Sequence, residues 1–153
     1  MTLLSKLIHR LNLTPGDNDV FIGGAGSGGV TADARLFGGL VAAQATMAAV
    51  RTVPDFPMHS LHAYFLRPGR PDADIEFHVT RSKEGRNFAV RNVAAWQAGA
   101  QIFQLHGSFQ RIAEGAEHQT EMPDVPPPSA LKQRAHRSDV SNTIHEKMEE
   151  RFV

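Results

Sequence analysis

The sequence predicts an α+β fold in which one long central helix is wrapped by a bent antiparallel β-sheet. The helix is predicted by residues 40–50, a run of strong helix formers with no charge on any face, which should be enclosed by protein nearly all round. The sheet is predicted because four strand-like segments follow this run through short turns, without another helix between them. One buried helix against an antiparallel sheet is an α+β layout.

The composition is that of an ordinary folded domain of 153 residues. Hydrophobic residues make up 41% of the chain and charged residues 21%, which excludes wholesale disorder. Sixteen Lys and Arg balance sixteen Asp and Glu, so we expect neither nucleic acid nor an anionic membrane surface as a partner. The chain has no cysteine, which excludes disulfides, thiolate metal sites and a cysteine nucleophile.

The first residues predict a short amphipathic helix that docks on a core. Leucine and isoleucine recur at helical spacing over residues 3–11, while Lys6, His9 and Arg10 break the uninterrupted apolar run that an export signal needs. The longest charge-free apolar stretch, residues 36–50, is too short to span a bilayer. We therefore expect a soluble cytoplasmic protein without a membrane span.

The strands are predicted from alternating apolar residues between turn residues. A short strand is expected at residues 19–23, and longer ones at 59–66, 73–81, 88–97 and 101–110. Within them, three groups of apolar residues each share one face: Ile75, Phe77 and Val79; Phe88, Val90, Ala94 and Trp96; Phe103, Leu105 and Phe109.

The chain is expected to divide into three parts. Residues 1–111 form the folded domain, and residues 112–129 form an acidic, proline-rich linker that ends in three consecutive prolines. Residues 130–153 form an amphipathic segment with a narrow apolar stripe, Val140, Ile144, Met148 and Phe152, which predicts a final helix.

Two motifs have a functional interpretation that their context weakens. Residues 24–29 satisfy the dinucleotide pattern G-x-G-x-x-G and leave a nucleotide-binding domain as one alternative, but residues 31–35 separate them from the helix and no second βα unit follows. His59 and His62 resemble a metal-binding pair, yet residues three apart on a strand point to opposite faces and no third ligand stands nearby. We expect an ordinary loop and no metal site.

The glycine pair Gly38–Gly39 is the most informative local feature. Glycine is unfavourable inside a helix, by about 1 kcal/mol relative to alanine, but in the first turn it lets another backbone or a ligand approach closely. The unpaired N–H groups there, together with the helix dipole, form a site for an oxygen that acquires negative charge. Tight packing of the helix on the sheet is the other interpretation, and the sequence leaves both open.

The segments around this pair resemble the type II acyl-CoA thioesterases, the TesB-like family. The most specific string is residues 59–69, which resembles that family's first long strand and turn. The resemblance runs in order from about Leu3 to Pro128. Five further segments also resemble the family: Arg35-Leu36-Phe37-Gly38-Gly39, Gln44, Thr52-Val53-Pro54, Gly85-Arg86-Asn87-Phe88 and Ser108-Phe109-Gln110.

The resemblance implies a single hotdog fold and the hydrolysis of fatty acyl-CoA to free fatty acid and CoA, without a cofactor. Members of the family carry two hotdog domains, and their catalytic Asp, Thr or Ser, and Gln lie in the second one. Residues 130–153 would therefore lead toward a second hotdog domain that is absent here, and no member of that trio is carried over. Leu40 stands where the family usually has Gln, which weakens an oxyanion role for the glycine pair.

The remaining candidates are few. For catalysis they are His59, Gly38, Gly39 and Gln44, and for contacts with CoA phosphates they are Arg67 and Arg86. A non-catalytic acyl-CoA-binding or structural hotdog module that acts with a partner is the other alternative. Because a single hotdog leaves sheet edges uncovered, we expect a homo-oligomer formed through hotdog pairing.

Overall fold

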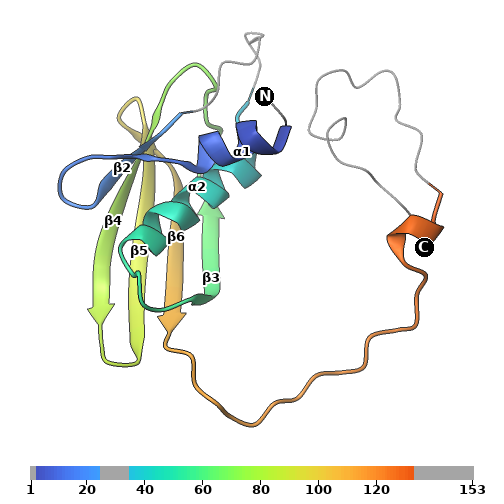
Figure 1. Ribbon diagram of the computed structural model, residues 1–153. Helices are drawn as coiled ribbons and strands as arrows, with labels where there is room; N and C mark the ends of the chain where they lie inside the picture. Colours follow the sequence, from blue (N-terminus) through green and yellow to red (C-terminus); the bar gives the residue numbers. More distant parts are fainter. Residues whose placement is uncertain (1–2, 25–34, 133–153) are drawn as a thin grey trace. The chain divides into compact units, whose positions relative to one another are not determined.

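The order of helices and strands along the chain follows the predicted α+β layout. The computed structural model describes residues 3–24 and 35–132 (Figure 1). Its elements are α1 (Leu3–Leu11), β1 (Thr14–Pro15), β2 (Val20–Gly23), α2 (Gly38–Arg51), β3 (Met58–Phe65), β4 (Ile75–Glu84), β5 (Phe88–Gln97), β6 (Ala100–Gln110) and a 3₁₀ helix (Pro128–Ala130). The long helix and the strands that follow it are therefore confirmed, each within a few residues of the predicted bounds.

The six strands form one sheet in the order β1-β2-β4-β5-β6-β3, and every neighbouring pair is antiparallel. The helix α2 lies across one face of this sheet, called here the inner face (Figure 1). An antiparallel sheet excludes the parallel architecture that a dinucleotide fingerprint requires, so the nucleotide-binding alternative is wrong. Most of its loop, residues 25–29, lies outside the described residues.

Small residues on α2 allow the helix to lie close to the sheet. Ala45, Ala48 and Ala49 are fully buried, and their short side chains leave room for the larger side chains of the strands. The apolar side chains of the inner face complete this core: Ile75, Phe77, Val79, Val93, Phe103, Leu105 and Phe109. Two of the three predicted apolar faces, those of β4 and β6, are therefore core faces.

The third predicted face, that of β5, points away from the helix. Phe88, Val90, Ala94 and Trp96 do share a face, but it is the outer face of the sheet, where none of them is fully buried. The inner face of β5 consists of Ala89, Arg91, Val93, Ala95 and Gln97. The apolar pattern alone suggests the wrong orientation, because two polar side chains on this strand are buried among hydrogen-bond partners.

The turn between β5 and β6 is a two-residue hairpin turn. Ala98 and Gly99 both have positive φ angles, 49° and 76°, between the paired residues Gln97 and Ala100. Two consecutive left-handed residues match the right-handed twist of the flanking strands, as in a type I′ turn. Ala98 and Gly99 thus form the short turn expected between the strands at residues 88–97 and 101–110.

The expected enclosure of α2 is only partial. Its side with Met47 and Val50 is not fully covered, and beside it Leu61 and Phe65 of the edge strand β3 are 51% and 63% exposed. The partners of Leu61 and Phe65 on β6, Gly107 and Phe103, are buried, so both side chains lie on the inner face. These four residues, Met47, Val50, Leu61 and Phe65, are called the apolar edge below.

The amino-terminal helix also leaves apolar surface uncovered. The helix α1 lies against α2, as expected, but Leu4, Leu7 and Ile8 are exposed. No helix within residues 3–24 and 35–132 has the length and hydropathy needed to cross a membrane.

The chain divides into two units, Met1–Glu114 and Gly115–Val153. Residues 111–127 contain neither helix nor strand and are exposed throughout. The helix predicted from Val140, Ile144, Met148 and Phe152 lies outside the described residues.

Candidate functional site

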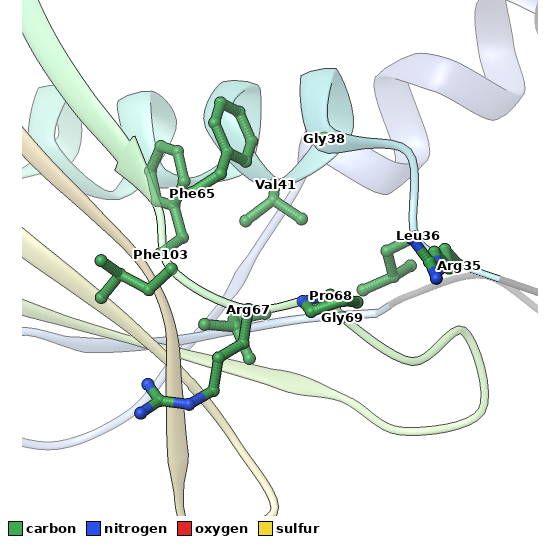
Figure 2. A pocket seen from close by; sticks show the side chains of 11 residues that line it. Arg35, Leu36, Gly38, Val41, Phe65, Arg67, Pro68, Gly69 and Phe103 are labelled. Atoms are coloured by element: carbon green, nitrogen blue, oxygen red, sulfur yellow. The ribbon is translucent and has the colours of Figure 1, made fainter.

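A pocket of about 310 Å³ opens beside the start of α2 (Figure 2). It is built from the loop before the helix, the first turns of the helix, the end of β3 with the loop that follows, and the start of β6. Its lining residues are Arg35, Leu36, Gly38, Val41, Phe65, Leu66, Arg67, Pro68, Gly69, Ile102 and Phe103. The lining is mostly apolar, as is usual for sites that hold small organic groups.

Gly38 forms the part of the pocket wall that the helix contributes. A Cβ atom at this position would lie 2.8 Å from the ring of Phe65, closer than side chains tolerate. The Phe65 ring in turn meets the buried ring of Phe103 edge to face, with 4.9 Å between centroids. Glycine at position 38 is thus required for this arrangement of the two phenylalanines. Gly39 faces Phe37 instead and does not line the pocket.

The start of α2 has no side-chain cap. Phe37 occupies the N-cap position in an extended conformation, and among residues 3–24 and 35–132 no side chain caps the first turn. The N–H groups of a first helical turn carry partial positive charge and lack the usual partners within the helix. In α2 the Leu40 N–H donates to the Phe37 carbonyl at 3.0 Å, so the first-turn donors for a ligand are those of Gly38 and Gly39. Leu40, which stands where the resembled family has Gln, is buried and is not a lining residue of the pocket.

The loop that closes the pocket is held by backbone hydrogen bonds. The N–H groups of Leu66 and Arg67 both donate to the Ile102 carbonyl, at 2.9 and 3.1 Å, and the Leu36 N–H donates to the Gly69 carbonyl at 3.0 Å. The side chain of buried Gln97 also holds this loop through three hydrogen bonds. Its Nε2 donates to the carbonyls of Arg70 and Ala73, and its Oε1 accepts from the Arg70 N–H, each at 2.7 Å.

The two arginines predicted to meet phosphates lie far apart. Arg67 is at the pocket rim, but its guanidinium points away from α2, and its Nη1 donates to the Gln101 carbonyl at 2.7 Å (Figure 2). Arg86 lies in the turn between β4 and β5, at the opposite end of the sheet. Along β5, Ala95, the partner of the pocket residue Phe103, lies seven residues after Phe88, where the turn ends. At the rise of an extended strand this separates Arg86 from the pocket by more than about 20 Å.

His59 is not brought to the helix start either. It lies at the beginning of β3, six residues from Phe65, where its Nε2 is 2.9 Å from Ser108 Oγ on the outer face of the sheet. A bulge between Met58 and Ser60 places His59 on that face. His59 and His62 therefore share a face, contrary to the expectation from regular strand geometry.

Gln44 is buried about two turns into α2 and links segments that are distant in sequence. Its Nε2 donates to the Arg10 carbonyl at the end of α1, at 2.8 Å, and to the Gly24 carbonyl after β2, at 3.2 Å. Its Oε1 is buried without a hydrogen-bond partner. This geometry gives Gln44 a role in joining α1 and β2 to α2.

The site thus combines an apolar pocket with an uncapped helix start. Among the described residues that line the pocket there is no histidine or carboxylate, so these residues supply no general base. Across residues 3–24 and 35–132, no three His, Cys, Asp or Glu side chains cluster closely enough to hold a metal ion. The sequence identifies Gly38, and Phe65 as one of the apolar residues that could line an acyl tunnel, but not Phe103, because Phe65 and Phe103 meet only through the pairing of β3 with β6.

Comparison with known proteins gives a consistent family. Residues 27–110 match the model of the acyl-CoA thioesterase N-terminal domain. Acyl-coenzyme A thioesterase 8 of Rattus norvegicus is 43% identical over 79% of the chain and 38% of its own length. Acyl-CoA thioesterase 2 of Haemophilus influenzae is 38% identical over 99% of the chain and 52% of its own length. The chain thus spans about half the length of these relatives or less.

Solved structures agree with the sequence matches. The acyl-CoA thioesterase II TesB2 of Mycobacterium marinum superimposes with a TM-score of 0.72 at 37% identity, over 82% of the chain and 47% of that protein. Another similar structure, from Alicyclobacillus acidocaldarius, is described as a hot dog fold. The hotdog fold that the resemblance implies is confirmed.

Proposed function

The chain belongs to the acyl-CoA thioesterase family, and from this membership we propose that it takes part in the hydrolysis of fatty acyl-CoA to free fatty acid and CoA. The observation that carries the proposal is the apolar pocket at the uncapped start of α2. A thioester has an apolar chain on one side of a carbonyl, and this site offers apolar walls beside backbone N–H groups.

In this proposal the acyl group enters the pocket between Phe65, Phe103 and Val41. The thioester carbonyl then lies at the start of α2, where Gly38 lets it approach the backbone without steric hindrance. Water attack on a thioester places negative charge on this oxygen, and one well-aimed N–H donor stabilises such a charge by roughly 3–4 kcal/mol. Arg67 at the rim is free to meet a CoA phosphate through the guanidinium N–H groups not used by Gln101.

The described lining residues do not supply the general base. Thioester hydrolysis needs a group that activates water, and the described residues that line the pocket include no histidine or carboxylate. We propose that this chain is the half that binds the acyl group, and that the family's catalytic Asp, Thr or Ser, and Gln belong to a second hotdog domain. A non-catalytic acyl-CoA-binding module that acts with a partner remains the alternative, favoured by the same lack of a base.

We further propose that the apolar edge is covered by a second copy of this chain. Met47, Val50, Leu61 and Phe65 expose apolar surface along α2 and beside β3, and β3 pairs only with β6 among the described strands. The relatives are about twice as long as this chain, which is consistent with two such domains side by side. Pairing would bury both the apolar side chains and the open strand edge.

A cytoplasmic location is part of the proposal. It is supported by the lack of cysteine, since such a chain gains nothing from an oxidising compartment. Cell fractionation with an antibody against the protein should find it with soluble cytoplasmic markers; recovery in a membrane or periplasmic fraction would contradict this location.

Calorimetry with palmitoyl-CoA tests the binding site. The wild-type chain should bind, and Gly38→Ala should weaken binding by about tenfold, or about 1.4 kcal/mol, because the new methyl group displaces the Phe65 ring. Gly115→Ala is the matched control, since a Cβ there meets nothing within 4 Å. Equal affinity of the wild type and Gly38→Ala would show that the site lies elsewhere.

A thiol-release assay with the same ester separates the two functions. The chain alone should release no CoA above the background rate, because the described residues that line the pocket supply no base. Turnover by the chain alone would show that it holds its own catalytic groups, and would exclude the non-catalytic alternative.

Light scattering at micromolar concentration tests the pairing. The wild type should have twice the mass of one chain, and Leu61→Glu should be monomeric because it places a charge on the apolar edge. Phe88→Glu, on the outer face, should leave the dimer intact. A monomeric wild type would refute the pairing.

A further inference from the structure

The outer face of the sheet brings two histidines together that are far apart in sequence. His62 on β3 and His106 on β6 are direct partners in the antiparallel register, and both are exposed. Directly opposed residues of an antiparallel pair have Cβ atoms about 4.5–5.5 Å apart. The two imidazoles are thus neighbours in a way that their sequence positions do not suggest.

Both imidazoles lean in the same direction along the sheet. The His62 ring meets the Tyr64 ring edge to face at 4.7 Å, and His106 Nε2 lies 2.9 Å from Gln104 Nε2. Tyr64 and Gln104 are themselves direct partners across the two strands. Both side chains therefore extend toward the same neighbouring pair of the outer face, Tyr64 and Gln104.

A third polar side chain stands next in the same row. Asn92 on β5 is the partner of His106 on its other side, and its Nδ2 donates to Ser82 Oγ at 2.9 Å. Its Oδ1 is buried and has no hydrogen-bond partner. Because Gln104 Nε2 is a donor, His106 Nε2 accepts and its proton lies on Nδ1. Asn92 Oδ1 is thus an acceptor without a partner on the residue directly opposite His106.

We propose that His62 and His106 form a binding site for one divalent transition-metal ion of the Cu²⁺, Ni²⁺ and Zn²⁺ class. Imidazole nitrogens bind such ions at about 2.0–2.1 Å, and two rings on opposed Cβ atoms can converge on one ion. The Gln104 amide gives up its contact with His106 Nε2 to the ion, and water fills the remaining positions. Asn92 Oδ1 accepts from His106 Nδ1–H, the outer contact that orients most metal-binding histidines.

The ligand set determines which ion is preferred. Nitrogen ligands favour Cu²⁺ over Ni²⁺ and Zn²⁺ in the usual order of stability, whereas Mg²⁺ and Ca²⁺ prefer oxygen. His62, His106, Asn92 and Thr80 are successive partners across β3, β6, β5 and β4. No carboxylate is among these four side chains. The site is independent of the proposed hydrolysis, because it lies on the face opposite α2.

Calorimetric titration of the untagged full chain with Cu²⁺ at pH 7.5 tests the site. The wild type should bind one ion per chain, and electron paramagnetic resonance should show two coordinated nitrogens. His62→Ala and His106→Ala should each lower the affinity by more than about tenfold, and Asn92→Ala by up to about tenfold, as for outer contacts in other metal sites. Gln104→Glu should raise the affinity, since it adds a carboxylate beside the ion.

His59→Ala is the matched control, because His59 lies on the same strand and the same face but bonds to Ser108. It should leave the affinity unchanged, and circular dichroism should show the same fold for every variant. The proposal is overturned if the wild type shows no saturable binding, if His106→Ala binds as tightly as the wild type, or if His59→Ala loses as much affinity as His62→Ala.

Discussion

Arg91 is a charged side chain that is buried among hydrogen-bond acceptors and forms one ion pair, with the exposed Glu84. It is 1% exposed, and its guanidinium donates to Thr52 Oγ1, to the carbonyls of Thr52 and Lys83, and to the Glu84 carboxylate. Thr52 is the C-cap of α2, where carbonyl groups lack partners within the helix and a positive charge is favourable. Arg91 therefore fixes the end of the central helix to the sheet.

Replacing this side chain should destabilise the fold. Arg91→Met keeps most of the volume but leaves the Thr52 carbonyl and hydroxyl without a donor, so we expect a loss of about 2–4 kcal/mol in the free energy of unfolding. Urea denaturation measures it. Glu84→Gln is the control and should cost less than about 1 kcal/mol, because Glu84 is mostly exposed. Equal losses in the two variants would contradict the role assigned to the buried hydrogen bonds.

Asp19 should make stability depend on pH in the acid range. Arg81 donates to both carboxylate oxygens, at 2.6 and 3.1 Å, and this hydrogen bonding lowers the pKa of Asp19 in the folded chain. A lowered folded pKa adds stability above the unfolded pKa of about 3.9, and this stability is lost as the pH falls through the folded value.

Asp19→Asn should therefore be less stable than the wild type at pH 7, and the difference should shrink as the pH falls below about 4, toward the lowered folded pKa of Asp19. Because Asp19 and Arg81 are 29% and 47% exposed, the difference should stay under about 1 kcal/mol. Thermal unfolding across pH 3–7 measures it, with Asp17→Asn as the control. A difference that stays constant over this range would contradict the ion pair as its cause.

The residues of the site were only partly predictable. Gly38 was identifiable because a glycine pair at a helix start has few other uses, and the structure places it in the pocket wall. Its neighbours Phe65 and Phe103 come from strands 38 residues apart and meet through pairing register. The shared face of His59 and His62 depends on a bulge, which regular alternation does not reveal.

At the scale of elements, short-range pattern predicted the strands well and their faces less well. The run 88–97 was placed correctly as β5, because its turns are marked by Gly85 and Gly99. Its inner face was not predictable from apolar residues, since Arg91 and Gln97 are buried only where Thr52 and the loop carbonyls accept their hydrogen bonds. Those partners come from other segments of the chain.

A substitution at Ala98, in the turn between β5 and β6, should raise the stability of the fold. A residue with a Cβ at φ 49° is unfavourable, and asparagine tolerates this conformation better than alanine in type I′ turns. Ala98→Asn should raise the free energy of unfolding by about 0.5–1 kcal/mol, whereas Ala98→Val should lower it. Urea midpoints measure both. An Ala98→Asn variant no more stable than Ala98→Val would show that the turn is not strained.

At the scale of the whole molecule, the uncovered surface is itself informative. A charge-free helix predicts enclosure on all sides, yet Met47 and Val50 lie on a side that the described chain does not cover. The sheet similarly ends in β3, whose apolar side chains are exposed. Both observations are explained by a second domain of the same kind on this edge, as we propose for a second copy of the chain.

The central claim is that this domain holds the acyl group of an acyl-CoA at the start of α2. A crystal structure of the chain with a non-hydrolysable palmitoyl-CoA analogue tests it most directly. The account predicts the acyl carbons against Val41, Phe65 and Phe103, with the carbonyl oxygen about 2.7–3.1 Å from a first-turn N–H of α2. An analogue bound on the outer face of the sheet, with this pocket empty, would contradict it.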